Sequence, residues 1–141
     1  MAAPCVFCSI AASEIEANVV FADEIAFAFL DHRPVFKGHT LLAPRAHVET
    51  LADLPSDLVG PFFTRARLVA RAVESGLGAD GTFVAINNKV SQSVPHLHVH
   101  VVPRRRKDGL RGFFWPRTKY EGAEEMAGYA SRISKTISEL V

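Results

Sequence analysis

Three histidines, His96, His98 and His100, alternate with apolar residues within one short segment. Side chains of an extended strand alternate between its two faces, so the imidazoles would share one face at intervals of about 6.6 Å. Each imidazole brings two ring nitrogens that are costly to bury without partners. Three interpretations follow: an incidental polar face, a three-histidine catalytic zinc site, or an imidazole nucleophile oriented by imidazole neighbours.

The two cysteines of the chain, Cys5 and Cys8, are spaced Cys-x-x-Cys near the N-terminus. No basic region followed by an apolar run precedes them, so we expect no secretory signal and a cytoplasmic location with reduced thiols. A disulfide that closes so short a loop would stabilise the fold little. The spacing leaves open a metal half-site, a redox pair or two unrelated small residues.

The segment from His96 to Val102 resembles the signature of the histidine triad (HIT) family, in which apolar residues separate three histidines. The resemblance covers most of the chain, from about Cys5 to Pro103. Further segments resemble the family's ribose-binding segment (Phe29-Leu30-Asp31 with Gly38-His39-Thr40), its phosphate-binding loop (Asn87-Asn88 with Gln92-Ser93-Val94) and the N-terminus of many bacterial members (Cys5-Val6-Phe7-Cys8).

This resemblance implies a covalent mechanism that needs no metal. His98 would attack the α-phosphorus of a nucleotide, and water or another acceptor would take the nucleotide from the imidazole. A neutral imidazole is nucleophilic near pH 7 because its ordinary pKa is about 6.5. A backbone carbonyl beside His100 would hold the second nitrogen of His98 as a donor. His100 would add orientation and phosphate contact, with His96 and His39 as the other members of the catalytic group.

The resemblance also implies a binding site for a purine nucleotide such as AMP. Asp31 would accept hydrogen bonds from both ribose hydroxyls, although an aspartate here also suits a turn before Pro34. Phe7 and Phe29 would enclose the base, or Phe29 would be ordinary core. The phosphate or leaving group would contact Asn87, Gln92 and Ser93. Dinucleoside polyphosphates and nucleoside phosphoramidates are both candidate substrates.

Four residues, Cys5, Cys8, His47 and His96, resemble a Cys-Cys-His-His zinc set found in some bacterial members. Zinc accepts these ligands in tetrahedral geometry, and a site closed by four protein ligands is structural. Such a site would tie the N-terminus to the sheet and orient His96, while His98 stays off the metal. His47 is otherwise an ordinary surface histidine.

Composition excludes several other classes of protein. Of 141 residues, 48% are hydrophobic and 22% are charged, which is enough apolar material for a folded core. Sixteen basic residues oppose fifteen acidic ones, so a net charge of +1 favours neither nucleic acid nor an anionic membrane. No apolar stretch approaches the roughly 20 residues of a membrane-spanning helix.

The pattern of apolar residues predicts an α+β fold, with a five-stranded antiparallel sheet packed with one long helix and a C-terminal helix, as in the HIT family. We expect a turn from Ser56, a helix from about Pro61 that ends before a left-handed Gly76, and a last helix over residues 121–140. One domain would span residues 1–141, with its core at about 5–103. The predicted strands are 19–21, 25–30, 39–43, 82–86 and 96–102, the last ended by Pro103.

The segment after the core, residues 104–141, holds a basic loop, an aromatic segment and the last helix. Arg104 to Lys107, with Arg111, form either a solvated loop or a contact to polyphosphate. Because HIT proteins commonly dimerise, we expect a homodimer in which Trp115 or its neighbours reach the interface or the ligand.

Two other functions stay open, a zinc-dependent hydrolase that uses the histidine cluster and a non-catalytic nucleotide-binding module.

Overall fold

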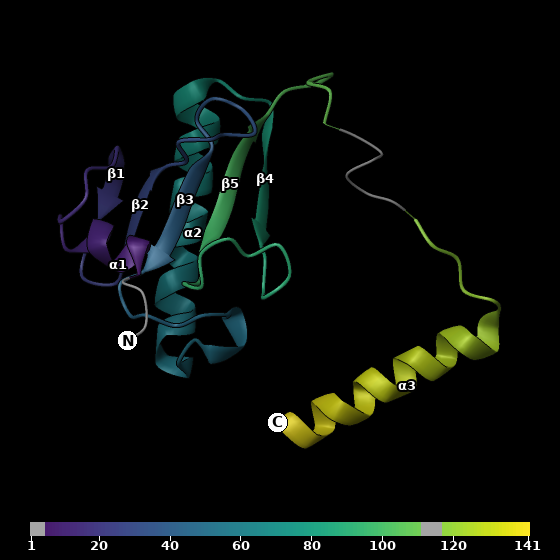
Figure 1. Cartoon of the computed structure of the whole chain (residues 1–141). Helices are drawn as coiled ribbons and strands as arrows, with labels where there is room; N and C mark the ends of the chain where they lie inside the picture. Colours follow the sequence, from purple (N-terminus) through teal and green to yellow (C-terminus); the bar gives the residue numbers. More distant parts are fainter. Residues whose placement is uncertain (1–4, 111–116) are drawn as a thin grey trace. The chain divides into compact units, whose positions relative to one another are not determined.

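A computed structural model describes residues 5–110 and 117–141 of the chain (Figure 1). The chain divides into two compact units, Met1–Asp108 and Gly109–Val141. The first unit contains the sheet with its helices, and the second contains α3 (Ala123–Leu140). The single domain over residues 1–141 stays a prediction. Trp115 and Arg111 lie outside the described residues.

The five strands form one antiparallel sheet in the order β1-β2-β3-β5-β4. The predicted α+β fold with a five-stranded antiparallel sheet is thereby confirmed. The strands are β1 (Val19–Ala22), β2 (Ala26–Leu30), β3 (Thr40–Pro44), β4 (Gly81–Ile86) and β5 (Val99–Arg104).

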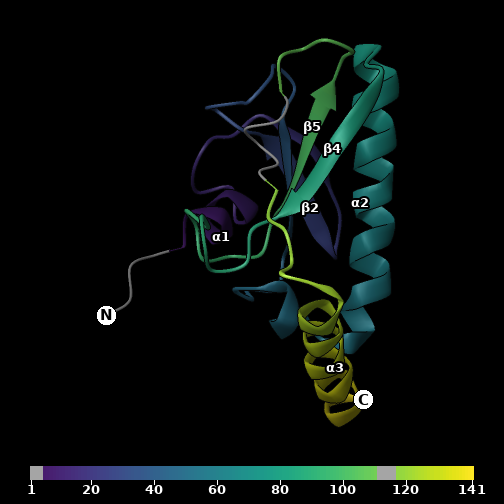
Figure 2. The ribbon, with the colours of Figure 1, turned by 90° about the vertical axis from the view of Figure 1, so that its right-hand side faces the viewer.

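Helices cover both faces of this sheet, as Figure 2 shows: α2 (Ser56–Leu77) lies along one face and the short α1 (Val6–Ala11) lies on the other. The alternation of side chains along β2 separates two cores. Ala26 and Ala28 pack with the α2 side chains, whereas Phe27 and Phe29 pack with Phe7 of α1. The central strands are therefore buried on both faces.

The segment that carries the three histidines alternates as predicted. Leu97, Val99 and Val101 are fully buried in the core beneath α2. The imidazoles of His98 and His100 lie side by side, with ring centroids 4.9 Å apart, on the side of the sheet where Phe7 packs. The histidines consequently face the α1 side of the sheet.

Both ends of this strand differ from the prediction. β5 begins at Val99, because its pairing with β3 and with β4 reaches only that residue, so His96 and His98 precede the strand. The strand also continues through Pro103 to Arg104. Pairing with β3 stops at Val101, so Pro103 has a paired neighbour on only one side, where a proline is tolerated.

The long helix also differs from the prediction at both ends. α2 runs without interruption from Ser56, with Pro61 inside it, because a proline in the second turn removes only one hydrogen bond from a helix anchored by many buried side chains. The left-handed residue at its end is Gly78, with φ of 60°, whereas Gly76 is helical. The predicted role of Gly76 is therefore wrong.

Two glycines offer a matched test of backbone strain. Gly38 has φ of +101°, and a Cβ there would lie 2.3 Å from Cδ1 of Leu77, whereas a Cβ on the helical Gly76 would meet nothing. We expect Gly38→Ala to lower the free energy of unfolding by about 1–3 kcal/mol. Gly76→Ala should leave it unchanged or raise it by up to about 1 kcal/mol. Urea unfolding measures both, and equal effects would contradict this account of Gly38.

Candidate functional site

The imidazole of His98 is held in one tautomer by the backbone. Its Nδ1–H donates a hydrogen bond of 2.7 Å to the carbonyl oxygen of His96, which can only accept. Nε2 of His98 therefore carries the lone pair, which is the state that a nucleophile requires. The carbonyl belongs to the first histidine of the cluster, so the expected carbonyl beside His100 is corrected to that of His96.

His39 and His100 form a second directed chain beside His98. The backbone N–H of Val35 donates to Nδ1 of His39 (3.1 Å), so the proton of His39 is on Nε2. That nitrogen lies 3.0 Å from Nδ1 of His100 and donates to it. The remaining proton of His100 is then on Nε2, where it is a hydrogen-bond donor for an anionic oxygen.

Burial keeps these imidazoles neutral. Burial lowers the pKa of His39, with Asp31 acting in the opposite sense. Burial, followed by the neighbouring His98 and His39, lowers the pKa of His100 to about 4. Both rings are thus uncharged donors and acceptors at neutral pH, as the hydrogen-bond chain requires.

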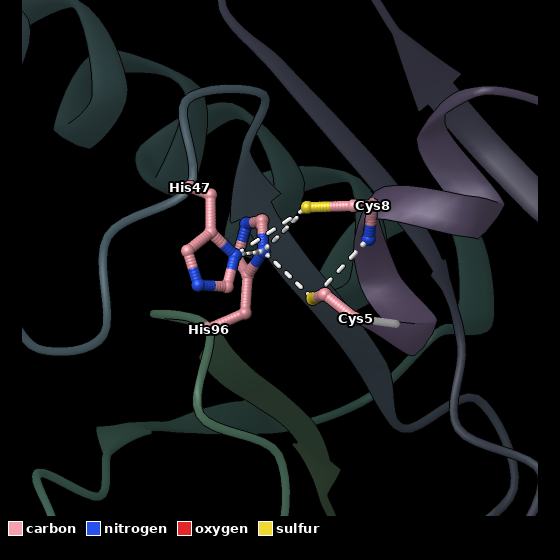
Figure 3. A group of neighbouring side chains, drawn as sticks. All are labelled: Cys5, Cys8, His47 and His96. Atoms are coloured by element: carbon pink, nitrogen blue, oxygen red, sulfur yellow. Dashed lines mark hydrogen bonds between the residues drawn. The ribbon is translucent and has the colours of Figure 1, made fainter. Parts of the chain in front are cut away.

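Four predicted metal ligands converge at the N-terminus, as Figure 3 shows. Cys5 and Cys8 come from the start of α1, His47 follows β3, and the buried His96 precedes β5. One ligand atom from each residue lies within 4.8 Å of all the others. His96 directs Nδ1 at the group because its Nε2–H donates to the carbonyl of Pro44 (2.8 Å).

The spacing of these atoms fits a tetrahedral zinc ion. With Zn–S of about 2.3 Å and Zn–N of about 2.05 Å, a tetrahedron has S···N edges of about 3.5 Å and an N···N edge of about 3.3 Å. Nδ1 of His96 lies 3.4 Å from Sγ of Cys5 and 3.6 Å from Sγ of Cys8. Nδ1 of His47 lies 3.4 Å from Sγ of Cys8 and 3.1 Å from Nδ1 of His96.

The Cys8 thiol is protonated when no metal is bound. In the protein alone, burial and then the neighbouring Cys5 raise the pKa of the Cys8 thiol to about 11. A bound zinc ion reverses this, because it stabilises thiolate ligands. The hydrogen bond from His96 to a backbone carbonyl is also the outer contact that metal-bound histidines commonly make.

The three histidines do not share a metal site. Within residues 5–110 and 117–141, His96 belongs to the cysteine cluster, whereas His100 groups with Asp31 and His39. His98 belongs to neither group. This division gives no support to a catalytic zinc ion bound by His96, His98 and His100 together.

The predicted nucleotide-binding residues lie around the histidines. One oxygen of Asp31 accepts from the N–H of Arg33 (2.9 Å), which is the turn role, and the other lies 3.7 Å from Nδ1 of His39. Phe7 and Phe29 are buried and meet edge to face with centroids 5.2 Å apart. Phe7 also lies 4.9 Å from the ring of His98. Their predicted contact with a base stays a prediction.

The predicted phosphate loop is fastened to the segment that follows His47. The amide of Gln92 donates to the carbonyl of Glu49 (2.6 Å) and accepts from the N–H of Lys89 (2.8 Å). Asn88, which belongs to the predicted loop but was given no role of its own, accepts from the N–H of Leu51 (2.9 Å). Gln92 thus shapes the loop. The predicted contact residues Asn87 and Ser93 are exposed.

The basic run is partly engaged within the first unit. Arg104 contacts Asp108 through Nε (2.6 Å) and Nη2 (3.0 Å). Arg105 donates to the carbonyls of Gly78 (2.6 Å) and Leu77 (2.8 Å), which end α2. These two guanidinium groups bond to the protein itself, which weakens the expected contact with polyphosphate.

Comparison with known proteins gives the family. The HIT domain profile matches residues 12–107. The chain is 34% identical over 137 residues to "Protein hit" of Bacillus subtilis (strain 168), covering 95% of this chain and 94% of that protein. It is 36% identical over 111 residues to the adenosine 5′-monophosphoramidase HNT1 of Saccharomyces cerevisiae, covering 77% and 68%.

Solved structures agree with this result. A HIT family member from Bacillus subtilis matches with a TM-score of 0.83 at 33% identity, over 94% of this chain and 96% of that one. A zinc-bound histidine triad family protein from Mycobacterium smegmatis matches with a TM-score of 0.71 at 34% identity, over 94% and 96%. This chain belongs to the HIT family. Within the described residues, no helix has the length and apolar character to cross a membrane.

The lowered pKa values predict how stability depends on pH. Below about pH 6.5 the histidines of the unfolded chain bind protons, whereas His39 and His100 of the folded chain stay unprotonated to lower pH because their pKa values are lowered. The free energy of unfolding therefore falls as the pH drops toward 4. Between pH 7.5 and 5.0, wild type should lose about 1–2 kcal/mol more than His100→Gln. Urea unfolding of both proteins at both pH values measures this, and equal losses would contradict a buried neutral His100.

Proposed function

We propose that this chain is a nucleotide hydrolase or transferase that forms a covalent nucleotidyl-histidine on His98. The observation that carries the proposal is the 2.7 Å hydrogen bond from Nδ1 of His98 to the carbonyl of His96, which leaves Nε2 as the nucleophile. Membership of the HIT family supports the same assignment.

The reaction proceeds in two displacements. The Nε2 lone pair of His98 attacks the α-phosphorus, the P–N bond forms, and the bond to the leaving group breaks, with a solvent proton reaching that group. Water then attacks the same phosphorus, forming a P–O bond, returning the electron pair to Nε2 and releasing a proton. Nε2–H of His100, together with Asn87 and Ser93, meets the charge on the phosphoryl oxygens. Asp31 holds the ribose.

The substrate we favour is a nucleoside phosphoramidate, such as AMP linked to an amine. The similarity to an adenosine 5′-monophosphoramidase supports this class. Arg104 is paired with Asp108, and Arg105 donates to the carbonyls that end α2, so fewer of their N–H groups are left for a dinucleoside polyphosphate. Phe7 and Phe29 would line the side of the pocket that receives the purine.

We further propose that Cys5, Cys8, His47 and His96 hold one structural zinc ion. Zinc bound there stabilises the N-terminal segment and takes no part in the two displacements. The spacing of the ligand atoms supports this site. Zinc-binding thiols must be reduced, which agrees with a cytoplasmic location. The proposal also includes a homodimer as the active form.

The nucleophile is tested with an AMP-amine phosphoramidate. His98→Ala should lower kcat by roughly 10³-fold or more, because no other imidazole presents a lone pair to the same phosphorus. AMP binding, measured by calorimetry, should change only a few-fold. Wild-type turnover should persist when a chelator is added that leaves the fold intact. An enzyme that depends on a catalytic zinc ion would lose its turnover under the same conditions. Turnover by His98→Ala equal to that of wild type would contradict the assignment.

The metal is tested by elemental analysis of two matched variants. His47→Ala should abolish zinc binding and lower the thermal midpoint, because it removes one of four ligands. His32→Ala changes an exposed histidine outside the cluster and should keep one zinc ion per chain. A wild-type protein that is purified fully folded without metal would contradict the site.

A further inference from the structure

The two cysteines of the chain lie at the two ends of one turn of backbone. Cys5 caps the N-terminus of α1, and its Sγ accepts from the N–H of Cys8 (3.4 Å), as Figure 3 shows. Cα atoms three residues apart in a helical turn are separated by about 5 Å, which lies within the range that a disulfide bridges. The chain has no other cysteine, so an internal disulfide can join only this pair.

The cysteine cluster is open to reagents on one side. Cys5 and Cys8 are half-buried, and the contact between Cys8 and His47 lies at the surface. A bound zinc ion keeps its sulfur ligands as thiolates, and the thiolate is the form that attacks a disulfide bond. The pair therefore combines a reactive form with access from solvent.

Phe7 links this pair to the proposed nucleophile, because it lies between the two cysteines in the chain. Its buried ring lies 4.9 Å from the ring of His98 and 5.2 Å from that of Phe29. Two thiolates on one zinc ion are about 3.8 Å apart, whereas two bonded sulfur atoms are about 2.05 Å apart. Closing a disulfide would thus move both ends of the segment that holds Phe7.

We propose that Cys5 and Cys8 form a reversible disulfide that releases zinc and weakens nucleotide binding beside His98. The proposal rests on the zinc ion and the nucleotide site proposed above and adds their regulation by a thiol oxidant. The oxidant is a small disulfide, such as oxidised glutathione. Loss of zinc also removes the connection of α1 to His47 and His96, so Phe7 loses its fixed position against His98.

The oxidation proceeds by two thiol–disulfide exchanges. The Cys8 thiolate attacks one sulfur of the small disulfide, a mixed S–S bond forms, and the first small thiolate leaves. The Cys5 thiolate then attacks Sγ of Cys8, the internal S–S bond forms, and the second small thiolate leaves. The two protein thiolates are oxidised, the small disulfide is reduced to two thiols, and zinc dissociates because two of its four ligands are lost. A disulfide across so short a loop gains little stability from loop closure, so excess reduced thiol reverses it.

Zinc release and disulfide formation are measured together on the zinc-loaded full chain in excess oxidised glutathione. We expect one zinc ion, detected with a colorimetric indicator, for every two thiols lost, and a chain mass lower by two hydrogen atoms. Reduced glutathione with added zinc should restore the thiols and the metal. A chain that keeps its zinc and both thiols would overturn the proposal, as would a chain that carries only mixed disulfides with glutathione.

The effect on the site is measured by calorimetry with AMP. Oxidation should raise the AMP dissociation constant of wild type by about 5-fold or more, because the packing of Phe7 is lost, and reduction with zinc should restore it. Cys8→His exchanges one zinc ligand for another and leaves a single thiol, so it should keep its zinc in the oxidant. Equal zinc loss by both proteins, or an oxidised wild type with unchanged AMP affinity, would contradict the proposal.

The same samples separate this proposal from those on which it rests. Zinc that is present in the reduced chain and retained after oxidation overturns the disulfide alone. A reduced, folded chain without zinc overturns the proposed metal site. Reduced wild type that does not bind AMP contradicts the nucleotide site, while the zinc and thiol measurements still decide whether the disulfide forms.

Discussion

The site depends on one residue, His96, which joins three parts of the molecule through three different atoms. Its carbonyl oxygen fixes the tautomer of His98, its Nε2–H is held by the carbonyl of Pro44, and its Nδ1 points into the cysteine cluster. The side chain is fully buried, so none of these contacts competes with water. A shift of His96 would therefore disturb His98 and the cysteine cluster together.

The chain segment after β3 extends this coupling to the phosphate loop. The carbonyl of Val48, the residue directly after His47, accepts from the N–H of Leu97 (2.7 Å). The next residues along the chain, Glu49 and Leu51, bond to the side chains of Gln92 and Asn88. The cysteine cluster, the residue before His98 and the predicted phosphate loop thus contact one backbone segment, through which the zinc ion proposed above would support the site without contacting substrate.

The sequence predicted which side chains lie together, but it did not predict which peptide groups bond to the imidazoles. The alternation of histidines with Leu97 and Val99 predicted which residues face the core, because strand periodicity acts locally. The convergence of Cys5, Cys8, His47 and His96 was predictable from residue type and family resemblance. The donor to His39 and the acceptor for His98 are peptide groups, which every residue carries, so only the fold reveals them. The helix start at Ser56 was missed for a related reason, since buried contacts override the local cost of Pro61.

The tautomer of His98 is the most direct test of the account. Nitrogen-15 NMR of protein labelled at histidine distinguishes protonated from unprotonated ring nitrogens. The structure predicts that, at neutral pH, His98 is protonated at Nδ1 and unprotonated at Nε2, with the Nδ1 proton slowed in exchange by its bond to the His96 carbonyl. A proton on Nε2 of His98 under the same conditions would contradict the account, because the proposed nucleophile would then have no lone pair to offer.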